Sequence, residues 1–235
     1  MKKIIIPIFL VFCVGSVTNT PAQGFVNLNF ESAVIVHDPS GGYTGSSYAS
    51  QAIPGWTAYI SEVPQTDIIY NDVPLSAPWV TLQGTNNILG LPAIQGKYFV
   101  MLWGEFNPNP PGNPAFETNS AAIGQTAQIP LSALSLTFWG AMGGMQVTFN
   151  GQPIDFLVTG GTANYNIYAA DISAYAGQTG QLLFTDPYYG NTFGGPSSID
   201  NLQFSSTAVP EPSALALGAL GALLLGFRRW LNSSR

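Results

Sequence analysis

The side chains that could act as nucleophiles or as their bases are few and have no evident partners. Histidine occurs once, as His37, and cysteine occurs once, as Cys13. A serine or cysteine nucleophile needs a neighbouring base, and the Gly-x-Ser-x-Gly sequence that presents an activated serine is absent. We therefore expect His37 to be an ordinary loop residue and no residue to serve as a catalytic nucleophile.

Paired carboxylates are the remaining route to catalysis, because glycoside hydrolysis needs only two Asp or Glu side chains at a suitable separation. The available carboxylates are scattered along the chain and form no close Glu-x-Asp-x-x-Glu cluster; they include Glu31, Glu62, Asp67, Asp72, Glu105 and Glu117. The sequence therefore favours a protein that is not an enzyme. A glycoside hydrolase or lyase remains as an alternative.

Aromatic side chains beside loops offer a second kind of chemistry, which is sugar binding. The C–H face of a sugar ring packs on a flat aromatic ring, while its hydroxyl groups bond to Asn, Gln or Asp side chains. Trp79, Tyr188 and Tyr189 flank loops and are the candidates for such a platform. Trp56, Trp103 and Trp139 lie inside apolar runs and are expected in the core. For any single aromatic residue, packing in the core or against a loop is the alternative.

The charge distribution excludes one large class of partners. Only 8% of the 235 residues are charged, whereas 46% are hydrophobic, so the chain is able to fold but its surface must be polar and neutral. Five of the six Lys and Arg residues lie in the terminal segments, which leaves Lys97 as the only cation between them and a net charge of −10 there. Nucleic acid is therefore excluded as a partner, because it requires clustered basic residues.

The N-terminal 22 residues have the pattern of a removable signal peptide. Lys2 and Lys3 precede an apolar stretch, Ile4 to Val17, and Thr20-Pro21-Ala22 offers small side chains for cleavage after Ala22. Phe12 precedes Cys13 where a lipoprotein needs a small residue, which argues against lipidation. With Cys13 removed, the mature domain has no disulfide.

The C-terminal segment, residues 209–235, has three parts in a fixed order. Pro210-Glu211-Pro212 is followed by the apolar run Ala214 to Phe227 and then by Arg228 and Arg229. Prolines end any preceding structure, the run is long enough for a short transmembrane helix, and arginines hold the C-terminus inside. This order resembles the PEP-CTERM sorting signal of Gram-negative bacteria. The resemblance implies a transient stay in the inner membrane and processing by an exosortase near the Pro-Glu-Pro motif.

Residues 23–208 are predicted to form one all-β domain. Short runs rich in Val, Ile, Phe, Tyr and Thr alternate with Gly, Pro and Asn clusters. Asn150-Gly151 predicts a tight hairpin turn between Met145–Phe149 and Ile154–Val158. Further strands are expected at Val26–Val36, Ile53–Ile60, Trp79–Leu82, Tyr98–Trp103, Ile123–Ile129, Leu136–Met142, Tyr165–Ile172, Gln181–Thr185 and Ser198–Phe204. Strands of this number and length predict a two-sheet antiparallel β-sandwich of the jelly-roll kind, with the uninterrupted apolar run Tyr98–Trp103 at its centre.

Several short sequence motifs in this domain resemble those of carbohydrate-binding and galactose-binding-like jelly rolls. They include Asn29-Phe30-Glu31, Ile53-Pro54-Gly55-Trp56 and Ile199-Asp200-Asn201. In such domains a Glu near the first strand and an Asp on the last strand often hold a structural calcium ion, and here these residues are Glu31 and Asp200. Oxygen ligands suit calcium. The alternative is a strand-edge carboxylate and an Asp that caps a turn.

Together these features predict an exported surface or matrix protein whose sandwich associates with extracellular polysaccharide. The expected partners are an exosortase-type enzyme and the inner membrane, both transiently, and then the polysaccharide. A purely structural matrix protein without a discrete sugar site is the main alternative.

Overall fold

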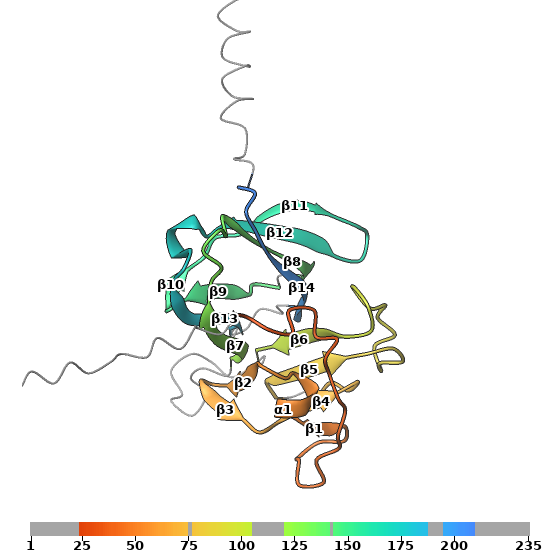
Figure 1. Ribbon diagram of the computed structural model, residues 1–235. Helices are drawn as coiled ribbons and strands as arrows, with labels where there is room; N and C mark the ends of the chain where they lie inside the picture. The colour runs from red at the N-terminus through yellow and green to blue at the C-terminus, as the bar shows by residue number, and fades with distance from the viewer. Residues whose placement is uncertain (1–23, 75–76, 105–119, 142, 188–194, 210–235) are drawn as a thin grey trace, which may run out of the picture.

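The computed structural model describes residues 24–74, 77–104, 120–141, 143–187 and 195–209. These residues form a β-sandwich with very little helix, as predicted (Figure 1). The elements in chain order are β1 (Ser46–Tyr48), α1 (Ala49–Ala52), β2 (Thr57–Ile60), β3 (Val63–Gln65), β4 (Asp67–Tyr70), β5 (Trp79–Gln83), β6 (Phe99–Trp103), β7 (Ala121–Gln128), β8 (Ser135–Ala141), β9 (Gln146–Phe149), β10 (Gln152–Pro153), β11 (Leu157–Gly161), β12 (Asn166–Asp171), the 3-10 turn η2 (Ser173–Tyr175), β13 (Thr179–Asp186) and β14 (Ser197–Ser205).

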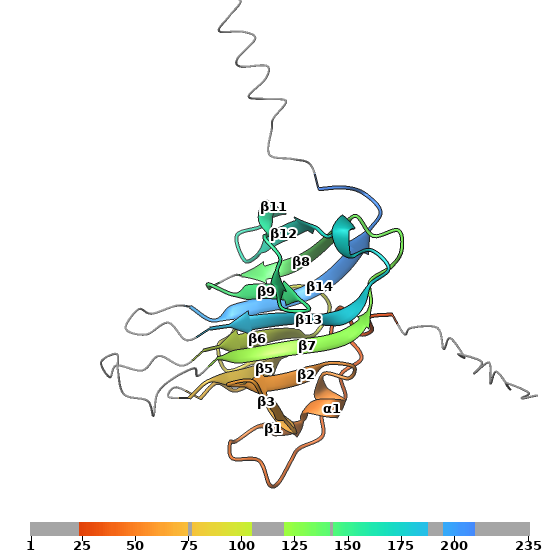
Figure 2. The ribbon, with the colours of Figure 1, turned by 90° about the vertical axis from the view of Figure 1, so that its left-hand side faces the viewer.

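The strands form two sheets that pack face to face. The eight-stranded sheet has the order β1-β4-β5-β6-β14-β8-β12-β11, and the six-stranded sheet has the order β10-β9-β13-β7-β2-β3. Within the described residues the neighbouring strands pair antiparallel, apart from the parallel pair β4 and β5. In Figure 2 the six-stranded sheet faces the viewer, with β13 and β7 across its middle.

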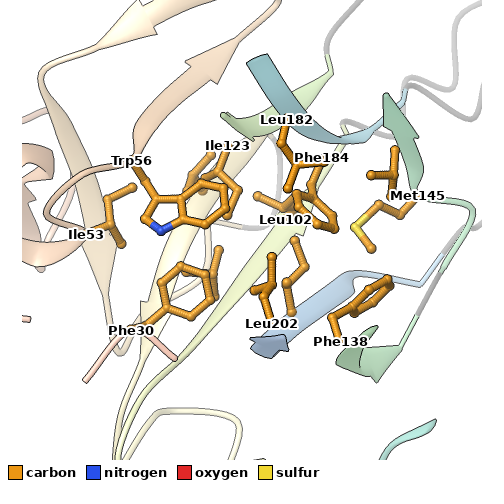
Figure 3. Close-up of a cluster of buried hydrophobic side chains, with 14 of the residues drawn as sticks. Phe30, Ile53, Trp56, Leu102, Ile123, Phe138, Met145, Leu182, Phe184 and Leu202 are labelled. Atoms are coloured by element: carbon orange, nitrogen blue, oxygen red, sulfur yellow. The ribbon is translucent and has the colours of Figure 1, made fainter. Parts of the chain in front are cut away.

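The main hydrophobic core lies between the sheets. Alternating side chains of each strand point inward, as the period of two in a strand requires. Phe184 lies at the centre, with its ring centroid 6.2 Å from that of Trp56 and 5.5 Å from that of Phe138 (Figure 3). Phe30 stacks against the other side of the cluster, 5.7 Å from Trp56. The prediction that Trp56 is a core residue is confirmed.

Strand β6 is covered on both faces, as its uninterrupted apolar sequence predicts. Val100 and Leu102 point into the main core, whereas Phe99 and Met101 belong to a second buried cluster on the outer face of the eight-stranded sheet. That second cluster forms because the chain between β5 and β6 places Ile94 against it. The central position of this strand is therefore confirmed.

Several segments differ from the sequence prediction, beginning with the first expected strand. The expected strand Val26–Val36 is a series of turns, because Asn27 and Phe30 adopt positive φ angles of 50° and 56°. The Asn27 side-chain amide stabilises this path by donating to the Pro54 carbonyl, and the Asn27 backbone carbonyl accepts the Trp56 indole N–H at 3.0 Å. This segment packs as an irregular cover at one end of the core and forms no strand.

The hairpin turn is where the sequence places it, with Asn150 and Gly151 at φ angles of 50° and 76°. The expected second strand Ile154–Val158 does not form, since β9 pairs on this side with β10, Gln152–Pro153, which precedes it. The chain then crosses to the other sheet, and Leu157–Gly161 becomes the edge strand β11 beside β12. Strand β1 lies at Ser46–Tyr48, where no strand is expected from the sequence. The expected strand Ile53–Ile60 starts only at Thr57, since Gly55 at φ 87° lies in a turn.

Candidate functional site

The two predicted calcium ligands both contact one short segment of the chain, residues 95–98. Asp200 lies in β14, where its pairing with β8 shifts register, and it is fully buried. Its Oδ2 accepts the Gln95 backbone N–H at 2.8 Å, and its Oδ1 accepts the Asn201 N–H at 2.6 Å. Asn201 has a positive φ of 47°, which marks an irregular turn of the strand at this residue.

Glu31 reaches the same segment from the N-terminal turns. Its Oε1 accepts the Lys97 N–H at 2.7 Å and the Tyr98 N–H at 3.0 Å. Between these contacts Gly96 has a φ of 62°, and a Cβ there would collide with the Glu31 carboxylate. A glycine is therefore required at this position for two reasons, backbone conformation and space. The arrangement joins the first turns, the β5–β6 connection and the last strand through two carboxylates.

Burial raises the pKa of Asp200 to about 7, because the charged form loses its contact with water. The Asn201 and Gln95 N–H groups oppose this shift, and the negative charge of Glu31 adds to it. The sequence thus correctly places Glu31 and Asp200 near each other, close enough for their charges to interact.

The donor atoms at this junction fit a calcium ion in kind. Gln95, whose backbone N–H contacts Asp200, also has a buried side-chain Oε1 that has no hydrogen-bond partner among the described residues. Carboxylate and amide oxygens such as these are the hard ligands that calcium prefers, and backbone carbonyls complete such shells in other proteins. In the structure both Asp200 oxygens and Glu31 Oε1 accept backbone N–H groups. Within the described ranges no three His, Cys, Asp or Glu side chains gather as a metal cluster. A cation here would relieve the repulsion between the two carboxylates.

The predicted aromatic platform is wrong at Trp79. This side chain is only 3% exposed, its indole N–H donates to the Pro74 carbonyl at 2.9 Å, and it stacks on Trp103 at 5.8 Å. It belongs to the buried cluster on the outer face of β5 and β6 because its strand pairs directly with the aromatic strand β6. Tyr188 and Tyr189 lie outside the described residues.

Two other tryptophans expected in the core are only partly buried. Trp103 stacks on Trp79 from the end of β6, and Trp139 stacks on Tyr165 with the rings 5.1 Å apart and nearly parallel at 8°. Both lie on the outer face of the eight-stranded sheet, so that face carries more aromatic surface than the sequence pattern indicates.

His37 contacts the backbone of strand β1. His37 forms an isolated bridge to Ser47, and its Nδ1 lies 3.0 Å from the Ser46 carbonyl oxygen.

Sequence reasoning missed two buried carboxylates, Asp38 and Asp186. Ser40 donates through its backbone N–H and its hydroxyl to Asp38, and these bonds lower the pKa of that carboxyl. Asp186 accepts the Ser197 N–H at 3.2 Å. No local sequence signal distinguishes these residues from exposed acids.

Comparison with known proteins identifies the C-terminal segment. Residues 208–229 match the PEP-CTERM protein-sorting motif. No curated protein and no solved structure matches the chain. The motif residues Pro210, Glu211, Pro212, Arg228 and Arg229 lie outside the described residues, as does the predicted helix Ala214 to Phe227. Within the described part of the chain, no helix has the length and apolar character needed to cross a membrane.

The motif defines the class of protein: this chain is an exported protein that is sorted by an exosortase and is associated with a membrane transiently. The sorting motif begins at residue 208, three residues after β14 ends at Ser205. The last described residues are fixed to the sandwich, since the Ser135 hydroxyl donates to the Thr207 carbonyl at 2.7 Å. The sandwich is therefore complete before the sorting segment starts.

Proposed function

We propose that this protein is a non-catalytic component of the bacterial cell surface or extracellular matrix, whose sandwich associates with extracellular polysaccharide after the tail has been removed. The observation that carries the proposal is the sorting motif placed directly after a finished sandwich. Cleavage near Pro210-Glu211-Pro212 releases the domain without removing any strand. The N-terminal signal peptide brings the chain to the exosortase, and the apolar run with its arginines holds it there.

The charge of the domain supports a neutral partner. Between the two terminal segments Lys97 is the only cation among eleven acidic residues, so a polyanion is repelled at low salt. The polar surface is built largely from Ser, Thr, Asn, Gln and Gly, whose hydroxyl and amide groups match the hydroxyl groups of a neutral glycan. A polysaccharide also surrounds a protein that is exported to a cell surface or matrix.

The test is binding of the purified domain, residues 23–208, to a panel of neutral polysaccharides by affinity electrophoresis, with reducing-sugar release measured on the same polymers. Retardation without sugar release is the expected result. Release of reducing sugar would replace the proposal with a glycoside hydrolase, and an unsaturated product would indicate a lyase. Absence of binding to every neutral polymer, including the exopolysaccharide of the producing cell, would replace it with a purely structural matrix protein.

We also propose that the junction of Glu31, Gln95 and Asp200 holds a structural calcium ion. A metal that binds only the folded state stabilises it by mass action, so the melting temperature should rise with free calcium and fall with chelator. Asp200→Asn should remove that dependence, whereas Asp155→Asn, at an exposed position, should keep it. A melting temperature that responds to neither calcium nor chelator would show that the two carboxylates have a purely structural role.

A further inference from the structure

A groove lies on the outer face of the six-stranded sheet, the face turned toward the viewer in Figure 2. Its volume is about 290 Å³. Its lining comes from the β2–β3 hairpin, from the start of β7 and from β13, and includes Tyr59, Glu62, Ser120, Gln181, Leu183 and Thr185. Among the sequence-predicted sugar- and metal-binding residues that the structure describes, none belongs to its lining.

The strand register explains why the sheet is hollowed here. Ala122 and Gly124 of the central strand β7 face outward, and their neighbours across the sheet are larger. Tyr59 of β2 pairs with Ala122 on one side, and Leu183 of β13 pairs with Gly124 on the other. A Cβ on Gly124 would lie 3.0 Å from Leu183 Cδ1 and 3.4 Å from Tyr59 Cε2. The Leu183 and Tyr59 side chains therefore lie close over Gly124, and Ala122 forms the floor of the groove between Tyr59 and Thr185, which pair with it on its two sides.

The lining combines apolar surface with neutral hydrogen-bonding groups. Tyr59 and Leu183 supply the apolar part, and Ser120 and Thr185 supply hydroxyl groups. The Gln181 amide nitrogen donates to the Tyr59 hydroxyl at 3.1 Å, which holds both side chains in place and leaves the tyrosine O–H free to donate. Sugar-binding sites need this mixture, because each sugar ring presents C–H surface and hydroxyl groups together.

Among the described residues of the lining, the charged one is an acid, Glu62. Glu62 occupies the tight β2–β3 turn with a φ of 67°, after Ser61 with a φ of 48°, and the Ser61 N–H donates to the Ser120 carbonyl at 2.9 Å. Turns of this kind usually contain Asn or Gly, because other residues are strained at positive φ. A carboxylate accepts strong hydrogen bonds from sugar hydroxyls. Among the described residues of the lining there is no Lys, Arg or His, so none of them carries a positive charge to balance that of an anionic ligand.

A second hollow, on the outer face of the eight-stranded sheet, is less suited to a sugar. It measures about 370 Å³ and is lined mainly by apolar side chains, among them Leu91, Ile94 and Met101, with Tyr165 at one side. Its described lining residues carry no charge, and they include the exposed aliphatic side chain of Leu91. Its Tyr165 provides a matched control for Tyr59, since both rings are partly buried on the outer face of a sheet.

We infer that the groove of Tyr59, Glu62, Gln181 and Leu183 is the site at which the domain binds a neutral hexopyranose unit of a polysaccharide chain. Tyr59 and Leu183 contact the C–H face of the sugar, while Glu62 accepts hydrogen bonds from its hydroxyl groups and the Ser120 and Thr185 hydroxyls complete the polar contacts. This inference rests on the proposed function and adds its site and ligand class.

The test measures affinity electrophoresis of the 23–208 domain in gels containing hydroxyethyl cellulose, xyloglucan or the producing cell's own neutral exopolysaccharide. Tyr59→Ala should weaken binding at least tenfold, through loss of apolar contact area. Glu62→Gln should weaken it about tenfold or more, since hydrogen bonds to charged groups are the stronger ones. Tyr165→Ala should bind as the parent does, and the melting temperature of each variant confirms that it is folded.

Glu62→Gly separates a binding role from a structural one. Glycine adopts the observed positive φ without strain, so this variant should melt at the same temperature as the parent or slightly above, yet lose binding as Glu62→Gln does. If the parent binds but the Tyr59 and Glu62 variants bind equally well, or if Tyr165→Ala alone loses binding, the groove is the wrong site and the proposed function stands. If the parent binds none of the three polymers, both the groove and the proposed function are wrong.

Discussion

The buried carboxyl of Asp200 makes the stability of the sandwich depend on pH in an unusual direction. Its pKa in the folded protein is about 7, whereas an Asp in an unfolded chain titrates near a pKa of about 3.9. Between these values the folded state holds a proton that the unfolded state has lost. The contribution of Asp200 is therefore fully present below pH 4 and disappears as the pH rises through 7.

The size of the effect follows from the difference between the two pKa values. Linkage gives a loss of roughly 3 kcal/mol in the free energy of unfolding between pH 4.5 and pH 7.5, as an upper estimate for this fully buried group. Other carboxylates such as Asp38, whose pKa is lowered, act in the opposite direction. The contribution of Asp200 is therefore isolated by comparing the parent with Asp200→Asn, which stays neutral.

The assay is urea unfolding of the metal-free domain at several pH values from 4.5 to 7.5, with chelator present. The stability of the parent relative to Asp200→Asn should fall by up to about 3 kcal/mol across this range. A saturating calcium concentration should reverse that trend if the ion binds here, because the ion favours the ionised carboxylate. A difference between parent and variant that does not change with pH in the metal-free protein would refute the raised pKa.

Three further substitutions test other parts of the account. Gly96→Ala should lower the free energy of unfolding by about 1–3 kcal/mol in urea titrations, because the new Cβ is strained at positive φ and collides with the Glu31 carboxylate; a neutral effect would contradict the close approach. Phe138→Ala should cost about 3–5 kcal/mol, since this ring is fully buried in the core, and a loss below 1 kcal/mol would contradict its placement. Tyr188→Ala combined with Tyr189→Ala should abolish glycan binding if these residues form a second platform, with the melting temperature within about a degree or two of the parent; unfolding of the double variant would make them core residues.

The positions of many strands can be predicted from the residue types within short segments of the sequence. The hairpin turn at Asn150-Gly151 is predictable because its residues tolerate positive φ, and the position of β6 is predictable because an uninterrupted apolar run must be covered on both faces. Both are properties of a few adjacent residues. The same kind of signal finds β5, β7, β8, β12, β13 and β14 with small errors at their ends.

The missed elements depend on contacts between distant parts of the chain. The segment Val26–Val36 has a strand-like composition, yet the hydrogen bonds of Asn27 with Pro54 and Trp56 fold it into turns. Trp79 lies beside a loop in the sequence, but the pairing of β5 with β6 buries it against Trp103. Neither outcome can be read from the neighbouring residues alone.

Some residues of the candidate sites are predictable from the sequence, whereas others become visible only in the folded structure. Glu31 and Asp200 were found through their resemblance to jelly-roll motifs, and the fold brings both to one segment of chain. Gln95 carries no sequence signal, because its importance arises only from the buried position of its side-chain oxygen. The groove at Tyr59 depends on the register of three strands, in which Gly124 falls between larger neighbours. A single sequence does not specify that register.

The most direct test of the central claim is the intact mass of the mature protein from surface-extracted material of the producing cells, compared between cells with and without their exosortase. The account predicts a surface protein that begins after Ala22 and ends near Pro210-Glu211-Pro212, and a longer, membrane-associated form in cells that lack the enzyme. Surface protein that retains the C-terminal peptide through Arg235 in cells with an active exosortase would contradict it.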